Sequence, residues 1–239
     1  YHRLGEGRKE HWGYGDGQLE LLETAKQKAK DSGLWNFFLP DADTGEGLSN
    51  LDYAFIANEL GKSPLASETL NCSAPDTGNM EVLERVGTPE QKEQWLKPLL
   101  NGEIRSAFAM TEPAVPSSDA KNVSTQAVLD GDEWVINGQK IWTSTAHHAD
   151  WIFCLVRTEP DAPKHLGISF LLFRMDTPGI EIRPLVDMTG DANFNEVFFT
   201  DVRVPKDQIV GERGQGWQVA NAILSHERGS LATPDAAIN

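Results

Sequence analysis

Asp130-Gly-Asp-Glu-Trp-Val-Ile-Asn-Gly138 is the stretch of sequence that decides the fold class. Aspartate–glycine and asparagine–glycine pairs are typical of two-residue hairpin loops, whose central residues need positive φ angles. Here the two pairs flank the apolar run Trp134–Ile136, which is rich in β-branched and aromatic residues. The stretch therefore predicts a short strand with a hairpin turn at each end.

The same pattern continues on both sides of this stretch. Trp151–Val156, Ile168–Phe173 and Glu196–Val204 are also rich in β-branched and aromatic residues. No run with helical periodicity separates them, and strands at this spacing indicate a barrel or a sandwich. We therefore predict a middle β-barrel domain over residues 104–210.

Residues 1–103 have the periodicity and the start signals of helices. The signals are, in order, the apolar series Leu19, Leu22, Ala25 and Ala29, a Ser49–Asp52 capping box before the run Leu51–Leu60, and the start Thr88, Pro89 and Gln91 before the run Pro89–Leu100. These residues are predicted to form an N-terminal helical domain.

The pattern becomes helical again after the glycine-rich residues 211–216. One helix cannot bury an apolar stripe by itself. We therefore expect residues 211–239 to be the start of a C-terminal helical domain, or to be covered by another chain. The residues that share the apolar face are Trp217, Ala220, Leu224 and Leu231.

The predicted fold class is α+β and multidomain: an N-terminal α-helical domain, a middle β-barrel domain and the first helix of a truncated C-terminal helical bundle. The sequence begins at Tyr1 rather than at methionine. From this we expect the natural N-terminus, and any targeting segment, to lie upstream.

Composition excludes several classes of function. The 239 residues include 36 acidic and 21 basic side chains, a formal charge of −15, and no basic stripe is visible, so nucleic acid is not expected as a partner. No apolar run is long enough to span a membrane. The two cysteines, Cys72 and Cys154, are too few for a disulfide framework and are expected to be small buried apolar residues.

Two further stretches have the residue types of a binding site. Ala107–Asp119 predicts a strand that breaks at Pro113 into a polar loop, which either binds an anion or a heterocycle or is an ordinary strand exit. Asn137–Ser144 places Trp142 beside hydroxyl residues, which suits either a flat polar ring system or a core tryptophan at a strand end.

Three other patterns do not support a site. The glycines of residues 211–216 have the wrong order for a phosphate loop and lack a surrounding βαβ unit. His147, His148 and Asp150 lack the spaced ligands of a metal site and indicate a solvated turn, so no metal is predicted. Ser117 and Ser118 lack the context of a nucleophile.

Several ordered motifs resemble the acyl-CoA dehydrogenase family, and together they cover essentially the whole chain. They are Gly87–Lys92, Leu99–Glu103, Thr111-Glu112-Pro113 followed by Ser118-Asp119, Asn137–Ser144 and Asn195–Pro205. The loop after Pro113 departs from the family pattern, because Ala114–Ser117 is one residue longer and lacks the usual glycines.

The resemblance implies an FAD cofactor and a role for particular residues. Positions that match the flavin contacts are Phe108, Met110, Thr111, Ser118, Trp142 and Ser144. Ser118 and Arg228 match residues on the substrate side. Glu227 matches the catalytic base of some family members, whereas in most members the base would lie beyond Asn239; its other interpretation is a structural partner of Arg228.

The implied activity is dehydrogenation of an acyl-CoA thioester to the trans-2-enoyl-CoA, with electrons passed to an electron-transfer flavoprotein. The alternatives are an oxidase or monooxygenase of the same fold, or a non-catalytic subunit or fragment that binds acyl-CoA. A homo-oligomer, dimer or tetramer, is expected. The location would be cytoplasmic in a bacterium and mitochondrial or peroxisomal in a eukaryote. We expect the 239-residue chain by itself to be a poor enzyme.

Overall fold

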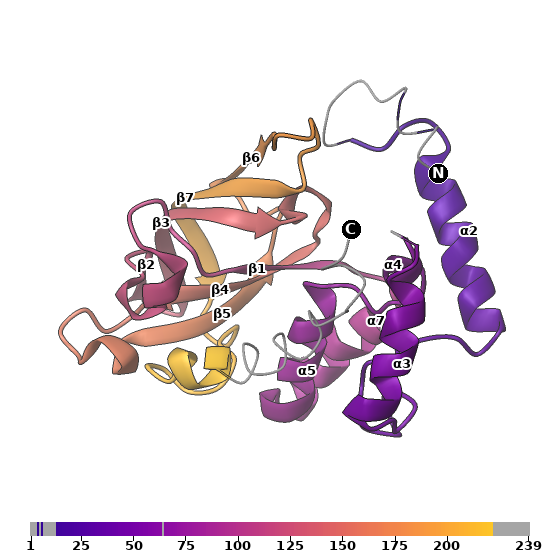
Figure 1. Ribbon diagram of the computed structural model, residues 1–239. Coiled ribbons are helices and arrows are strands. Elements are labelled where there is room, and N and C mark those ends of the chain that lie inside the picture. Colours follow the sequence, from indigo (N-terminus) through magenta and orange to yellow (C-terminus); the bar gives the residue numbers. More distant parts are fainter. Residues whose placement is uncertain (1–3, 5, 7–12, 64, 222–239) are drawn as a thin grey trace. The chain divides into compact units, whose positions relative to one another are not determined.

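A computed structural model describes residues 4, 6, 13–63 and 65–221 (Figure 1). The chain divides into two compact units, one reaching Glu81 and the other beginning at Val82. The predicted domain limits, 1–103, 104–210 and 211–239, stay predictions.

The first unit consists of helices. They are α2 (Gln18–Asp31), α3 (Asn50–Leu60), α4 (Ala66–Thr69) and α5 (Asp76–Val86), the last of which continues into the second unit. The Ser49–Asp52 capping box forms as predicted, because the Ser49 side chain accepts a hydrogen bond from the backbone N–H of Asp52.

The buried face of α2 differs from the predicted apolar series. Leu19 is 47% exposed, whereas Leu22 and Ala29 are buried together with Lys26. The Lys26 ammonium lies 3.0 Å from Glu68 and 3.1 Å from Glu23, and these ion pairs let a charged residue occupy the inner face.

After the end of α5, the second unit contains one helical stretch between Thr88 and Asn101, as predicted. It contains α6 (Pro89–Gln91), a π-helical turn η1 (Lys92–Leu96) and α7 (Lys97–Leu100). Pro98 follows the π turn and has no N–H to donate, which favours the irregular hydrogen bonding there.

The rest of the second unit is a curled seven-stranded sheet (Figure 1). Its strands are β1 (Ser106–Ala109), β2 (Gln126–Asp130), β3 (Glu133–Ser144), β4 (Trp151–Arg157), β5 (Ile168–Arg174), β6 (Ile180–Leu185) and β7 (Phe194–Pro205). The order is β1-β4-β2-β3-β7-β6, and β5 pairs with the other edge of β4. The longest helical segment between residues 104 and 204 is the six-residue η2 (Ser117–Asn122), so the barrel-like architecture is confirmed.

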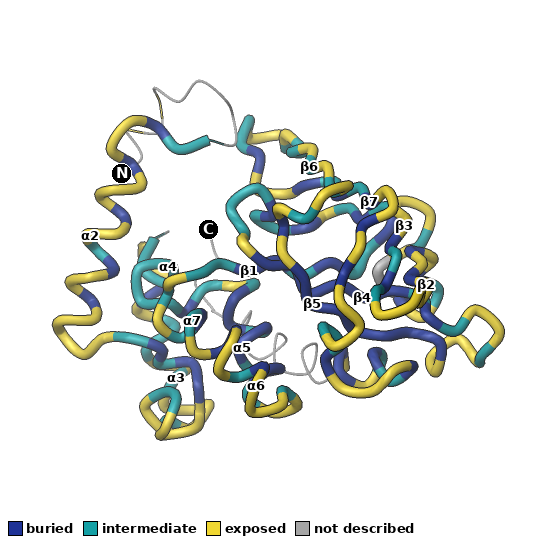
Figure 2. The backbone as a smooth tube through the Cα atoms, turned by 180° about the vertical axis from the view of Figure 1, so that it is seen from behind, coloured by how far each residue is buried: buried dark blue, intermediate teal, exposed yellow. Residues whose placement is uncertain are grey.

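One face of the sheet forms the main core of the unit. β4 and β5 are buried along almost their whole length (Figure 2). The buried residues of this cluster are Ala107, Ala109, Ala127, Trp134, Ile136, Ala146, Ile152, Cys154, Val156, Leu171, Phe173, Met175, Val197, Phe199, Val202 and Val204. On the opposite face of β4 the ring of Trp151 packs edge-on against Trp95 of η1, with 5.5 Å between ring centroids.

Of the two predicted hairpin turns, one is confirmed and one is wrong. Asp130 pairs with Glu133, so Gly131 and Asp132 form a two-residue loop between β2 and β3. Asn137 and Gly138 lie inside the continuous strand β3 instead. The Asn137 side-chain oxygen accepts a hydrogen bond from the backbone N–H of Asp201 at 2.9 Å, where β7 contains one extra residue.

Gly138 is required there for close packing rather than for a turn. Its φ is 151°, and a Cβ at this position would lie 2.7 Å from Thr125 Oγ1 and 2.8 Å from Thr125 Cα. Asn137 fills a bulge and Gly138 allows a neighbouring backbone to approach, yet the same Asn-Gly pair is also typical of a hairpin turn. The sequence pattern could not separate the two.

Two predictions from composition can be compared with the described residues. Cys72 and Cys154 are both buried and free, as expected. Among the helices that the structure describes, none has the length and apolar character needed to cross a membrane.

Candidate functional site

The fold brings the two candidate motifs side by side. The chain that leaves β1 runs along β3, where the Thr111 carbonyl accepts a hydrogen bond from the Ile141 N–H at 2.9 Å. The Met110 carbonyl accepts a second one from the Lys140 ammonium at 3.1 Å. The segments Phe108–Thr111 and Trp142–Ser144 are therefore neighbours in space.

Trp142 has an unusual backbone conformation for a large residue. β3 contains one residue more than β7 between Lys140 and Thr143, and Trp142 adopts a φ of 60° at this bulge. Its side chain is 58% exposed, and its ring meets Phe194 edge-on at 6.0 Å. Strained conformations of this kind gather at functional sites, because the surrounding structure must hold them in place. The interpretation of Trp142 as a core tryptophan is wrong.

The other predicted flavin contacts in these two segments are half-buried. Ala107 and Ala109 of β1 belong to the core cluster, so Phe108 points to the opposite face of the sheet, where its ring lies 6.2 Å from that of Phe170. Met110, Thr111 and Ser144 are also partly exposed. Their contact with flavin stays a prediction.

A buried ion pair that the sequence analysis missed joins the two motifs. Lys140 and Glu112 have side chains that are 0% and 3% exposed, with 2.9 Å between Nζ and Oε1. The Glu112 carboxylate also accepts hydrogen bonds from the Ser124 N–H at 2.7 Å, the Ser124 hydroxyl at 2.5 Å and the Thr125 N–H at 2.8 Å. The carboxylate is thus fully surrounded by donors, as a buried charge requires.

This arrangement fixes the ionisation state of Glu112. Burial alone would raise the pKa of the carboxyl group. The charge of Lys140 and the hydrogen bonds from Ser124, Thr125 and Lys140 outweigh burial and lower the pKa from 4.5 to about 2. Glu112 is therefore an anion at neutral pH. A lysine that alternates with the inward-facing Trp134 and Ile136 along β3 was the one signal in the sequence that pointed to this pair.

Glu112 also closes the loop that carries Ser118. Because its carboxylate binds Ser124 and Thr125, the two ends of residues 112–125 are held together. The backbone of Ser118 lies within η2, inside this loop. Its proposed place near the flavin phosphates stays a prediction.

The histidine pair lies in a structured turn rather than in the expected solvated one. His147 and His148 are half-buried in the 3-10 helix η3 (Ala146–His148), and His147 Nδ1 lies 2.9 Å from Asn195 Oδ1. Burial lowers the pKa of His147, opposed in part by the bond with Asn195. Within the described parts of the chain, no group of three or more potential ligands could hold a metal ion.

The glycines of residues 211–216 have a packing role. The Gly214 N–H donates to the Ser169 hydroxyl at 2.9 Å. A Cβ at Gly216 would lie 2.4 Å from the Ser169 carbonyl carbon and 2.7 Å from the Phe170 nitrogen. Small residues are needed here so that this segment can approach β5 closely.

Two of the predicted site residues, Glu227 and Arg228, lie outside the described residues. The predicted helix that carries them is described only for residues 216–221. The candidate base and its neighbour therefore remain predictions.

Comparison with known proteins gives the same family for both parts of the chain. The model of the acyl-CoA dehydrogenase N-terminal domain matches residues 10–103, and the model of the middle domain matches residues 107–202. The acyl-CoA dehydrogenase FadE2 of Mycobacterium tuberculosis is 47% identical over 214 residues. These residues cover 87% of this chain and 52% of FadE2. Acyl-CoA dehydrogenase family member 10 of Mus musculus is 48% identical over 221 residues, which cover 87% of this chain and 20% of that protein.

Solved structures agree with these sequence matches. A Mycobacterium abscessus structure described as an acyl-CoA dehydrogenase is 43% identical and superposes with a TM-score of 0.85, over 93% of this chain and 55% of that one. The chain thus spans about half the length of FadE2 and of this structure. Since both domain models match in chain order and the fold agrees, the chain belongs to the acyl-CoA dehydrogenase family.

Proposed function

We propose that the protein carrying this chain is an FAD-dependent enzyme that oxidises an acyl-CoA thioester to the trans-2-enoyl-CoA. The observation that supports this function most directly is the bulge at Trp142. A flat, largely exposed aromatic ring is held there in a strained conformation, beside the segment Met110–Thr111. Family membership supports the reaction class, and this local geometry supports the proposal of a flat cofactor beside Trp142.

The residues around the bulge suit an isoalloxazine ring. Trp142 offers an aromatic plane, Phe108 and Met110 offer apolar surface, and Thr111 and Ser144 offer hydroxyl groups. Donors of this kind stabilise negative charge on a polar ring system in a site with little water. When bound, FAD would accept a hydride from the β-carbon of the substrate.

The chain's own residues would do three things in this reaction. Trp142 and Phe108 would orient the flat ring, and Ser118 would bind the substrate. A carboxylate must remove the α-proton, and Glu227 is the candidate within this chain, with Arg228 beside it. These roles follow from the family motifs.

We further propose an electron-transfer flavoprotein as the electron acceptor and a homo-oligomeric assembly. A solved structure with 25% identity and a TM-score of 0.73 is described as the electron transferring flavoprotein of Acidaminococcus fermentans. Another neighbour, with 32% identity, is the ChsE4-ChsE5 complex of Mycobacterium tuberculosis. The first title supports an electron carrier as partner, and the second supports an assembly of more than one chain, whereas the homo-oligomer rests on the family resemblance.

The test uses the purified protein that carries this chain. We expect it to hold FAD, and we expect its visible flavin absorbance to bleach when acyl-CoA is added without oxygen, with enoyl-CoA detected by mass spectrometry. Trp142→Ala should lower flavin occupancy, whereas Trp35→Ala, in the other compact unit, should not. Stoichiometric hydrogen peroxide in air would indicate an oxidase instead. Flavin that never bleaches, or an absence of flavin, would contradict the proposed function.

A further inference from the structure

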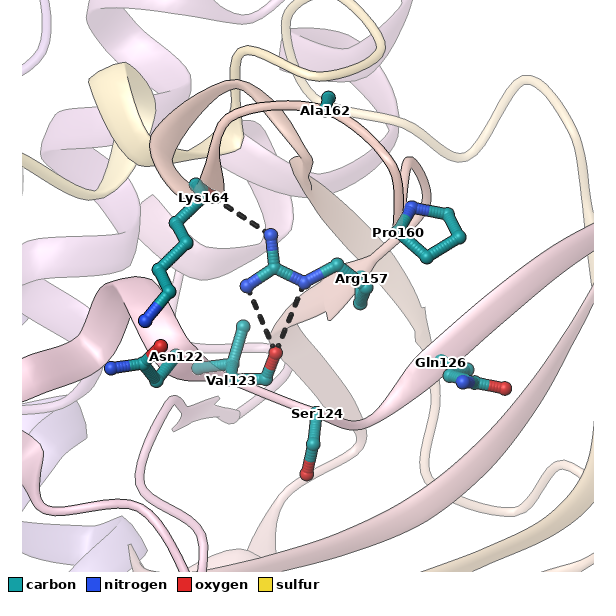
Figure 3. Close-up of a pocket in the computed structure, with 8 residues that line it drawn as sticks. All are labelled: Asn122, Val123, Ser124, Gln126, Arg157, Pro160, Ala162 and Lys164. Atoms are coloured by element: carbon teal, nitrogen blue, oxygen red, sulfur yellow. Dashed lines mark hydrogen bonds between the residues drawn. The ribbon is translucent and has the colours of Figure 1, made fainter.

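Arg157, at the end of β4, makes hydrogen bonds of an uncommon kind for an arginine. Its guanidinium donates only to backbone carbonyls in the bonds that the structure shows: to Lys121 at 2.7 Å, to Val123 at 3.1 and 3.2 Å, and to Lys164 at 2.8 Å. Figure 3 shows the guanidinium lying between Val123 and Lys164. One side chain therefore ties two separate loops together.

The two loops are well defined in the chain. The first is the end of the Glu112 loop, which includes η2 and carries Ser118. The second is the connection from β4 to β5, which contains the short helix η4 (Lys164–Leu166). The backbone N–H of Arg157 also donates to the Thr125 carbonyl at 2.7 Å, so the arginine is anchored to the first loop through its main chain as well.

The site is built to accommodate this side chain. A Cβ at Gly167 would lie 2.7 Å from Arg157 Nη1 and 2.4 Å from the Glu159 carbonyl oxygen. Gly167 thus leaves the space that the guanidinium occupies. Burial lowers the pKa of Arg157, and the charge of Glu112 opposes this effect. Burying a cation among carbonyls, without a carboxylate partner, costs folding free energy. We therefore expect the Arg157 side chain to have a structural role that offsets this cost.

Arg157 and the two loops that it joins line a pocket. This pocket has a volume of about 290 Å³ (Figure 3). Its lining contains two cations, three polar side chains and no carboxylate, in a chain with a formal charge of −15. The lining residues are Asn122, Val123, Ser124, Gln126, Arg157, Pro160, Ala162 and Lys164.

We propose that Arg157 is a positioning residue for the acyl-CoA substrate: it holds the Ser118 loop against the β4–β5 connection and so sets the substrate-binding side of the site. This inference rests on the proposed function, in which Ser118 contacts the substrate. Arg157 itself does not take part in the chemistry. Its removal should weaken substrate binding more than flavin binding, because of the six predicted flavin contacts only Ser118 lies in this loop, and it should leave the chemical step in place.

The experiment compares Arg157→Ala, Arg157→Lys and Gly167→Ala in the flavin-containing protein. For Arg157→Ala we expect KM for acyl-CoA to rise about tenfold or more, with kcat and flavin content within about threefold of wild type, because several hydrogen bonds that order the loop are lost. Millimolar guanidinium chloride should restore part of the KM, since the free ion can occupy the same cavity. Arg157→Lys should restore little, because an ammonium group cannot span both loops.

Gly167→Ala should also raise KM, because the added Cβ would meet both the Glu159 carbonyl oxygen and Arg157 Nη1 and so shift the β4–β5 connection. Arg203→Ala is the matched control, because Arg203 is exposed and pairs with Asp130 and Glu133 away from these loops. An unchanged KM in Arg157→Ala, or a parallel loss of kcat, flavin and thermal stability without rescue by guanidinium, would overturn the positioning role.

Binding of a non-reacting 3-thia-acyl-CoA, measured by calorimetry, separates this inference from the proposed function. A wild type that binds the analogue but does not oxidise acyl-CoA, together with weaker analogue binding by Arg157→Ala, supports the positioning role and contradicts the dehydrogenase activity. A wild type that binds no analogue overturns both.

Discussion

Replacing Lys140 by methionine removes the cation that lies 2.9 Å from the Glu112 carboxylate. Methionine keeps an unbranched side chain in the strand, so the main change is the loss of charge. Glu112 would remain buried with hydrogen bonds from Ser124 and Thr125 but without its counter-ion. Breaking a buried pair in this way costs about 3–5 kcal/mol of unfolding free energy. For a chain of this size the expected fall in Tm is roughly 10 °C.

The pH dependence of stability gives a second measure of the same pair. The pKa of Glu112 is lowered from 4.5 in its ordinary state to about 2 in the folded state. A lowered pKa means that the ionised group stabilises the fold at pH values above about 4.5, and that this contribution is lost as the pH falls from about 4.5 towards 2. Its upper size is about 3 kcal/mol. Glu112→Gln should lack this part of the pH dependence.

The assay is urea unfolding followed by tryptophan fluorescence, together with thermal unfolding followed by circular dichroism, at pH 7 and at several values down to pH 3. Arg203→Met is the matched control, because its ion pairs with Asp130 and Glu133 are exposed and should leave Tm nearly unchanged. The double variant Glu112→Gln, Lys140→Met should lose less stability than the two single variants added together. A Lys140→Met variant as stable as the control would refute the reasoning, and so would a Glu112→Gln variant with wild-type pH dependence.

Three further predictions concern single positions. Trp142→Phe should keep most of the flavin and Trp142→Ala should lose much of it, as measured by absorbance after gel filtration; equal occupancy in both would contradict a role for the aromatic plane. Gly138→Ala should destabilise the fold by about 3 kcal/mol, because the added Cβ meets Thr125, whereas Gly131→Ala, with open space around it, should cost about 1 kcal/mol; urea unfolding compares the two, and similar losses would count against close packing at Gly138. Glu227→Gln in the flavin-containing enzyme should slow α-proton exchange by about 10²–10⁴-fold if Glu227 is the base, and exchange within a few-fold of wild type would place the base elsewhere.

Local signals were sufficient to predict much of the fold. The capping residues Ser49 and Thr88 bind backbone groups three residues away, so a short stretch of sequence is enough to predict each helix start. The loop at Gly131 is equally local. The strand β6 was not predicted, because Ile180–Leu185 carries charged residues and a proline and is paired on one side only, along β7.

Features that depend on distant partners were not predictable. The bulge that Asn137 fills lies on β7, 64 residues away in the chain, and Glu112 meets Lys140 only because β1 and β3 lie in one sheet. Residue types marked the two motifs as candidates, and the family resemblance favoured a binding site over the structural alternatives. The ion pair that joins them became evident only when the fold placed them together.

The closure of the Ser118 loop has a consequence for how this protein can vary. The Glu112 carboxylate joins the two ends of the loop, and the Arg157 guanidinium binds the carbonyls of Lys121 and Val123. Residues 113–120 therefore lie between two anchored ends. Doubling the length of a flexible loop costs only about 0.6 kcal/mol once its ends are fixed. An added residue in Ala114–Ser117 can therefore be absorbed without moving a strand. Natural selection, or an engineer, can therefore lengthen and reshape this loop while the predicted flavin contacts outside it, Phe108 and Trp142 among them, stay unchanged.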